Sequence, residues 1–356
     1  MRPPRKPPPA EPDEEDPGAT PEDELWFLPG PDPDEDDLPP GAPPLPVADR
    51  RALFDPAAWR KAQEGLGAGL ARLAQIFGEL DLRLRGAGQG ARHRLALREA
   101  ADLSWWAGDR VALDRLGLWV ALREGARDDT EQALARAGWA MRRLAGGPDP
   151  AAGLAAFLER PLDEEAAGQG GAEPGAVASL AEILAESAAL HPVTQAAILF
   201  QAWRILGADR TRDMEAAVLA ARHAATMSRR PGQGALFLPL ATTGSGAFQG
   251  AGAPAAKLAA WIAGAEQASL AALLQLERIA EWERAAQEAT ADLSGRTPAR
   301  LIAVLAQWPL VSAPLAEAET GASRAAIQRN LDRLTARGLI REVTGQGRYR
   351  LWAARA

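Results

Sequence analysis

The C-terminal stretch 297–352 constrains the fold most, because a chemical signal marks each of its predicted boundaries. Thr297 is expected to cap a helix that begins at Pro298, since proline lacks only an N–H that the first turn leaves unpaired. Pro309 cannot continue a helix and is expected to end it. Between these limits apolar residues recur at helical spacing: Leu301, Ile302, Val304, Leu305 and Trp308.

Two further short helices follow. Ser312 and Pro314 open the first, which is expected to stop at Gly321, a residue that adopts positive φ without steric cost. Ser323 is expected to cap the second, which covers 324–337. This helix places its apolar residues on one side: Ile327, Leu331 and Leu334.

Two strand-like segments, 341–343 and 349–351, flank Gly345-Gln346-Gly347, a sequence typical of a hairpin tip. The order helix, helix, turn, helix, hairpin predicts a winged helix-turn-helix over residues 296–353. The predicted fold class is mainly α. A multi-helix body over 51–292 precedes this domain, and a disordered, acidic, proline-rich N-terminus covers 1–50.

The predicted domain favours DNA binding. The helix after the turn fits the major groove of double-stranded DNA, and the hairpin reaches an adjacent backbone or the minor groove. Residues 296–356 contain ten arginines and four acidic residues, a net charge of +6, whereas the whole chain carries −7. Such a concentration of basic residues is typical of a phosphate-binding module. The expected contacts are Ser323, Arg324, Gln328, Arg329, Arg333, Arg348 and Arg350.

The ending GLIREVTGQGRYRLW resembles the C-terminus of an alphaproteobacterial family of unknown function. Members of that family pair a helical body with a C-terminal helix-turn-helix DNA-binding domain. The resemblance extends to LARLAQIFGELDLRLR at 70–85, to LALREAADLSWWAGDRVALDRLGLWV at 95–120 and to the segment around Trp203. It implies a DNA-binding or regulatory protein.

The first 50 residues have a different composition from the rest. They hold sixteen of the 28 prolines and fourteen acidic residues against four basic ones. Such a segment lacks the apolar surface that offsets ordering entropy, so we expect disorder. Its acidic charge is also expected to compete with DNA for the basic domain.

Helical patterns fill the body. One begins at the Asp55-Pro56 cap and continues to about Leu84, and the long pattern from Pro254 to about Asp292 predicts a spine in which Gly264 marks a bend. The segment 235–240 fits either a short strand or an extended chain. The other predicted helices are 92–106, 111–123, one starting at the Asp128-Asp129-Thr130 cap, 176–189, 193–206 and 213–228.

The body is also similar to Fic-type nucleotidyl transferases, helical enzymes that often end in a winged helix. Their motif is H-P-F-x-x-G-N-G-R, in which the histidine accepts a proton and backbone N–H groups hold phosphate. After Phe200-Gln201-Ala202-Trp203 this chain has no such sequence, and His191-Pro192 is followed by an apolar helix. Some Fic proteins carry an inhibitory Ser…Glu-Gly helix, and in the similar segment Ser104-Trp105-Trp106-Ala107-Gly108 Ala107 stands where that glutamate would be. We therefore expect no enzyme activity, with an inactive Fic-like scaffold that docks protein as the alternative function.

The sequence favours a cytoplasmic protein without cofactors. It contains no cysteine, no secretory leader and no run of about 18 apolar residues that would span a membrane. His93, His191 and His223 lack metal-ligand spacing, so we expect them to face solvent or to bond locally. Regulators of this kind usually present two reading helices to DNA, which predicts a homodimer with the 254–292 helix as its seam.

Overall fold

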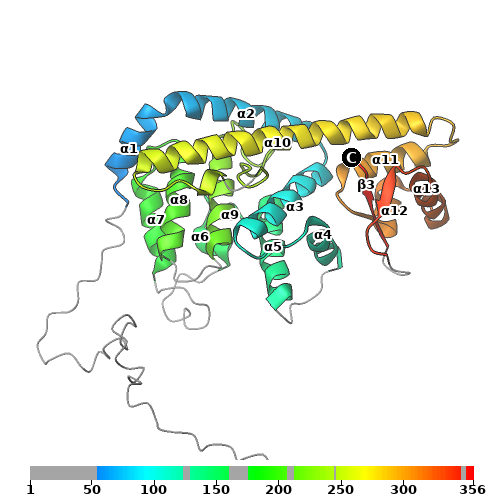
Figure 1. The fold of residues 1–356 in the computed structure, drawn as a ribbon, viewed down its shortest axis with the longest axis horizontal. Coiled ribbons are helices and arrows are strands. Elements are labelled where there is room, and N and C mark those ends of the chain that lie inside the picture. Colours follow the sequence, from blue (N-terminus) through cyan, green and yellow to red (C-terminus); the bar gives the residue numbers. More distant parts are fainter. Residues whose placement is uncertain (1–53, 123–128, 160–174, 207–211, 244–245, 346–349) are drawn as a thin grey trace, which may run out of the picture. The chain divides into compact units, whose positions relative to one another are not determined.

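The computed structural model describes residues 54–122, 129–159, 175–206, 212–243, 246–345 and 350–356. These residues form a mainly α-helical fold, as predicted (Figure 1). The predicted N-terminal segment 1–50 lies outside the described residues. The body contains α1 (Pro56–Gly65), α2 (Gly67–Gly86), α3 (Gln89–Trp106), α4 (Leu113–Leu122), α5 (Asp129–Ala145), α6 (Leu154–Leu158), α7 (Ala176–Glu186), α8 (Pro192–Leu206), α9 (Arg212–Ala224), the short 3-10 helices η5 (Ala225–Met227) and η6 (Gly246–Phe248), and α10 (Pro254–Ala289).

The prediction of one helix from Asp55-Pro56 to about Leu84 is wrong in one respect. This stretch forms two helices, α1 and α2. Asp55 caps α1 as expected, and its side chain accepts a hydrogen bond from the backbone N–H of Ala57 at 2.9 Å. The helix breaks at Leu66, which has φ −115° and ψ 16°. Gly65 and Gly67 flank the break, and glycine weakens a helix by roughly 1 kcal/mol relative to alanine. Two such residues together allow the change of direction.

Several other body helices depart from their predicted bounds, and those predicted at 176–189 and 213–228 end earlier, at Glu186 and Ala224. The helix predicted at 92–106 begins three residues earlier, at Gln89, and the one predicted at 111–123 covers Leu113–Leu122. The pattern did not predict α6, whose five residues are too few to show a helical period. Burial of Leu154, Phe157 and Leu158 stabilises this short helix.

The segment 235–240 is an extended chain rather than a strand. Its N–H groups bond to helices instead of to a neighbouring strand. Ala235 donates to the carboxylate of Asp81 at 2.9 Å, and Leu238 donates to the carbonyl of Ala221 at 2.9 Å. Leu240 and Ala241 both donate to the buried carboxylate of Glu99, at 2.7 and 2.8 Å. The segment is therefore held to α2, α3 and α9.

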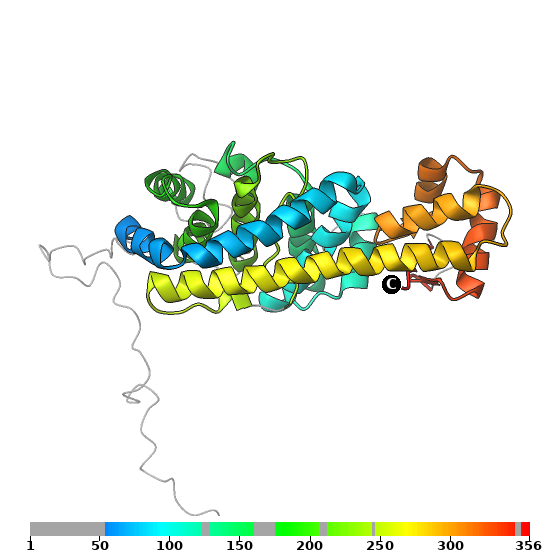
Figure 2. The ribbon, with the colours of Figure 1, turned by 90° about the horizontal axis from the view of Figure 1, so that it is seen from above.

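The spine prediction is confirmed: α10 continues unbroken for 36 residues, about 54 Å at the usual rise. It lies beside α2 and runs on into the C-terminal domain (Figures 1 and 2). Gly264 does not interrupt it. A Cβ at Gly264 would lie 2.1 Å from the backbone nitrogen of Ala247, so this glycine lets η6 approach the helix closely.

Two hydrophobic clusters divide the described residues. The larger one is the core of the body and takes Trp261 and Leu273 from α10. The smaller one is the core of the C-terminal domain and takes Ile279, Trp282 and Ala286 from the same helix. The last turns of α10 thus belong to the C-terminal core.

The C-terminal domain contains α11 (Thr297–Gln307), β1 (Val311–Ser312), α12 (Ala313–Thr320), α13 (Arg324–Ala336), β2 (Ile340–Glu342) and β3 (Leu351–Ala354). The strands form an antiparallel sheet in the order β1-β3-β2. Trp352 pairs with Val311 on one side and with Glu342 on the other. The sheet therefore closes the chain back onto the start of α12.

Three details of this domain correct the sequence prediction. Thr297 is the first helical residue and not the cap, because Arg296 already has helical backbone angles and no side chain caps the helix. The predicted strands 341–343 and 349–351 are shifted to β2 and β3, which follow the register set by Trp352. No local pattern predicted β1, since a two-residue strand forms only against its partner.

Candidate DNA-binding surface

The turn between α12 and α13 is built by local chemistry, as predicted. Gly321 ends α12 with a φ of 68°, a value that a side chain would make costly. Ser312 caps α12, and Ser323 caps α13 by accepting a hydrogen bond from the N–H of Ala326 at 3.4 Å. The hydroxyl of Ser323, an expected DNA contact, is therefore part of the turn.

The apolar side of α13 determines which of its residues face outward. Ile327, Leu331 and Leu334 are fully buried against the C-terminal core. The surface that these three residues leave free carries the exposed residues Arg324, Arg329 and Arg333 and the half-buried Gln328. We call these four residues the α13 face. The structure thus brings four of the predicted contacts together on one helix.

The members of the α13 face differ in their partners. Arg324 lies 3.5 Å from the carboxylate of Glu317, and Gln328 donates to Asp332 at 2.9 Å. The guanidinium groups of Arg329 and Arg333 have no partner among the described residues. They lie one helical turn apart, where like charges destabilise a helix by a few tenths of a kcal/mol. Two unpaired cations in this arrangement are suited to an external anion.

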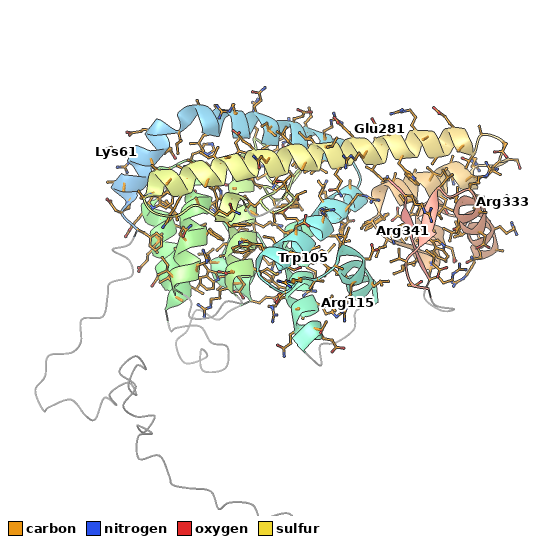
Figure 3. All side chains as sticks on the ribbon, viewed as in Figure 1. Lys61, Trp105, Arg115, Glu281, Arg333 and Arg341 are labelled. Carbon is orange, nitrogen blue, oxygen red and sulfur yellow. The ribbon has the colours of Figure 1, made fainter. Side chains whose placement is uncertain are left out.

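Other arginines of the domain hold the fold together, a division that the sequence did not reveal. Arg300 donates to the carbonyl of Thr320 at 3.0 Å and so satisfies the end of α12. Arg337 binds the carboxylate of Asp292 through two hydrogen bonds of 2.7 Å. Arg341 on β2 binds Asp114 of α4 at 2.8 Å, and it lies on a different side of the domain from Arg333 (Figure 3).

At the base of the hairpin another arginine, Arg350, is bound to a carboxylate. Arg350 donates to the carboxylate of Glu342 through Nε at 2.8 Å and Nη2 at 2.5 Å, and its guanidinium lies 4.9 Å from the ring centre of Trp352. The hydrogen bonds from Arg350 hold the pKa of Glu342 below its usual value. Arg350 therefore presents only part of its surface outward. Arg348, the other predicted contact in the hairpin, lies outside the described residues.

The body contacts the C-terminal domain at the end of α11. Arg94 of α3 donates to the carbonyls of Leu305, Ala306 and Trp308, at 2.8, 3.1 and 2.7 Å. These are carbonyls that a helix end leaves unpaired. Burial lowers the pKa of Arg94 to about 10, so it remains charged at neutral pH. A Cβ on Gly90 would lie 2.8 Å from the carbonyl carbon of Gln307, which shows how closely α3 approaches.

The three histidines bond locally or inside the core. The ring of His93 bonds to the carbonyl of Gln89 at 3.0 Å, and Nδ1 of His191 accepts from the N–H of Val193 at 3.2 Å. His223 is buried, with Nε2 at 2.7 Å from the side-chain oxygen of Gln195. Within the described residues, His, Asp and Glu side chains form no group of three suited to a metal ion. Among the described helices, none has both the length and the apolarity that crossing a membrane requires.

Comparison with known proteins agrees with this geometry. Residues 299–354 match a family described as an HTH DNA binding domain. These bounds contain α12, the turn, α13 and all three strands. No curated protein matches the chain. The chain therefore carries a helix-turn-helix DNA-binding domain at its C-terminal end.

Proposed function

We propose that this protein is a cytoplasmic transcription regulator that binds double-stranded DNA through a winged helix. In this proposal α13 enters the major groove, and the hairpin formed by β2 and β3 acts as the wing. The order helix, strand, helix, helix, strand, strand supports the assignment. The α13 face then supplies the contacts to bases and phosphates.

One observation carries the proposal: Arg329 and Arg333 are exposed and have no partner among the described residues, whereas other arginines of the same domain are bound to carboxylates or carbonyls. A surface arginine without a structural task is free to bind phosphate or the edge of guanine. A protein-docking domain would have less need of adjacent unpaired cations.

The test is a fluorescence-anisotropy titration of the full chain on random duplex DNA at several salt concentrations. Binding that weakens steeply with salt is expected, because phosphate contacts release counterions. The double variant R329A/R333A should lose most of this affinity. Arg60→Ala, which removes an exposed arginine from α1, is the matched control and should bind as the parent does. Salt-independent binding, or none, would favour the alternative of a protein-docking module.

We also propose a homodimer that uses the outer side of α10. Leu270 and Leu274 are one helical turn apart on this helix, and 52% and 46% of their surfaces are exposed. Burial of a leucine stabilises an association by roughly 1.5–3 kcal/mol. Light scattering should give a dimer for the parent and a monomer for L270E/L274E. A parent that remains monomeric at micromolar concentration would rule out the seam.

We propose no nucleotidyl transfer. The sequence that would have to hold the catalytic histidine after α8 lacks it, and His191 accepts a backbone N–H at the start of α8. The protein should transfer no label to itself from labelled ATP, UTP or CTP with Mg²⁺. Labelling above background would overturn this part of the proposal.

A further inference from the structure

A pocket of about 720 Å³ opens between α3, α4 and α5. Sites for small molecules usually have volumes of about 300–1,000 Å³ and apolar walls with a few polar groups. The apolar part of this wall comes from Trp119, Val120, Met141 and Ala145. Its polar part comes from Gln89, His93 and Arg142. The pocket therefore has the size and the mixed lining of a ligand site.

The charge of the lining favours an anion. Arg142 is exposed, and its guanidinium has no partner among the described residues. Gln89 is the first residue of α3, where the helix carries partial positive charge. Among the described residues that line the pocket there is no aspartate or glutamate. An anionic group would thus find attraction from the described part of this wall, which carries no opposing carboxylate.

Trp119 adds an unused hydrogen-bond donor. Its six-membered ring packs on α5 at Gly138, where a Cβ would lie 2.2 Å from Cζ3. The indole Nε1 is buried and has no acceptor among the described residues. Buried donors without partners are rare in native proteins, and each one calls for an explanation. Because this nitrogen is buried, a ligand oxygen in the pocket reaches it only after the indole turns toward the pocket.

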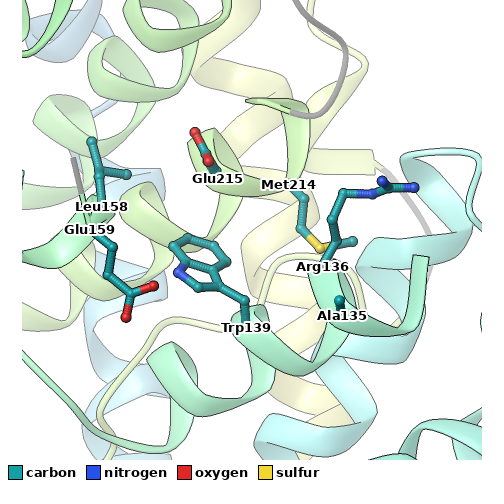
Figure 4. A pocket seen from close by; sticks show the side chains of 7 residues that line it. All are labelled: Ala135, Arg136, Trp139, Leu158, Glu159, Met214 and Glu215. Carbon is teal, nitrogen blue, oxygen red and sulfur yellow. The ribbon is translucent and has the colours of Figure 1, made fainter. Parts of the chain in front are cut away.

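A second pocket, about 450 Å³ between α5, α6 and α9, differs in this respect (Figure 4). Its charged side chains already have partners. Arg136 binds Asp109 at 2.6 Å, Glu159 lies 2.6 Å from Arg143, and Glu215 accepts from the indole of Trp203 at 3.0 Å. The charged groups that line this pocket are therefore less available to a ligand.

We propose that the pocket between α3, α4 and α5 binds a small carboxylate with an aromatic or branched aliphatic body. The carboxylate pairs with Arg142, and the apolar body lies against Trp119, Val120 and Met141.

The pocket adjoins the contact between α3 and the end of α11 in the DNA-binding domain. Gln89 and His93 line it from the first two turns of α3, and the same turns carry Gly90 and Arg94 to the end of α11. His93 also contacts Trp308, with ring centres 5.2 Å apart. Ligand binding is thus expected to change the position of α11, and through it the affinity for DNA. This second step rests on the proposed function, whereas ligand binding does not.

Calorimetry with naphthylacetate and its neutral amide, naphthylacetamide, tests the site directly. The parent should bind the acid at least about tenfold more tightly than the amide. Arg142→Gln should remove this preference, and Arg60→Gln should retain it. Ala145→Trp should fill the pocket and abolish binding of both compounds. Val120→Phe, from α4, serves the same purpose if the tryptophan variant does not fold.

Equal affinity for acid and amide, undiminished binding by a folded pocket-filling variant, or no binding of the acid would overturn the proposal. The DNA titration is then repeated with saturating naphthylacetate. A change in DNA affinity that Arg142→Gln removes supports the coupling. If the parent binds naphthylacetate but never binds DNA, the proposed function fails and the ligand site stands. If it binds DNA equally with and without the compound, only the coupling fails.

Discussion

The guanidinium of Arg94 lies 2.7 Å from the carbonyl oxygen of Trp308, the residue that ends α11. Two further carbonyls of the same helix end accept from it. One half-buried cation of the body thus satisfies the last turn of the DNA-binding domain's first helix. We expect the docking of that domain to depend on this residue.

Replacement of Arg94 by Met should loosen this junction. Three part-buried carbonyls lose a charged donor, which is expected to lower the free energy of unfolding by about 1–3 kcal/mol. Urea unfolding measures the loss, and faster hydrogen exchange near the end of α11 locates it. Arg98→Gln, an exposed position on the same helix, is the control. Equal stability of the two variants would show that the hydrogen bonds of Arg94 to α11 are dispensable.

Arg329→Ala and Arg333→Ala should have different effects on DNA binding. Arg329 is nearer to the start of α13, the end that usually contacts base edges, so its loss should cost about 1–3 kcal/mol at a cognate site and relax sequence preference. Arg333 is one turn later and is expected to contact phosphate. Its loss should weaken all sequences alike and reduce the salt slope by about one. Titrations on cognate and random duplexes at two salt concentrations separate these outcomes.

Arg350 is expected to act mainly through the hairpin. Its bonds to Glu342 are at the surface, so Arg350→Ala should lower the free energy of unfolding by at most about 1 kcal/mol. Glu342→Ala should release the guanidinium and tighten binding to random DNA. If the Glu342 variant instead binds DNA less tightly than the parent, the pair is required intact.

Glu99 should make stability fall as pH rises. Its carboxyl is fully buried, and burial raises its pKa to about 7, against the hydrogen bonds from Thr242, Leu240 and Ala241 that favour the anion. The folded state therefore holds the proton more tightly than the unfolded chain. Its contribution is present below pH 4.5 and is lost as pH rises to about 7, a change of at most about 3 kcal/mol. Glu99→Gln should remove this slope in urea unfolding between pH 5 and 8.

His223 should produce the opposite slope. The side-chain nitrogen of Gln195 donates to two carbonyls. The side-chain oxygen of Gln195 therefore accepts a hydrogen bond from the Nε2–H of His223. Nδ1 has no partner among the described residues, and burial lowers the pKa of His223 to about 4. Stability should therefore fall as pH drops from 6.5 towards 4. This trend should be clearest in Glu99→Gln and absent from a Glu99→Gln/His223→Gln double variant.

Local signals predicted most of the helices and several of their caps. Asp55, Ser312 and Ser323 bond to backbone groups within three residues, and Gly321 adopts its positive φ at the expected place. The predicted α13 face also follows from local spacing, because burial of Ile327, Leu331 and Leu334 turns the arginines outward. The helix-turn-helix was accordingly visible in the sequence.

The tasks of individual arginines could not be predicted, since they depend on distant partners. Arg94 bonds to carbonyls more than 200 residues along the chain, and Arg341 bonds to Asp114 across 227 positions. In the sequence alone, all ten arginines of 296–356 counted equally toward one basic charge. The close approach of η6 that requires Gly264 is likewise a contact between separate elements, so the sequence suggested a bend instead.

The continuity of α10 sets a rotational phase between the two cores that it enters. Each residue added between Leu273, in the body core, and Ile279, in the C-terminal core, would turn the far end by about 100° and advance it by about 1.5 Å. The α13 face would then point in a new direction, while α3 and α4 held the same domain in the old one. The chain should therefore tolerate insertions or deletions in this short interval least. A continuous helix cannot accommodate a change of length as a loop would.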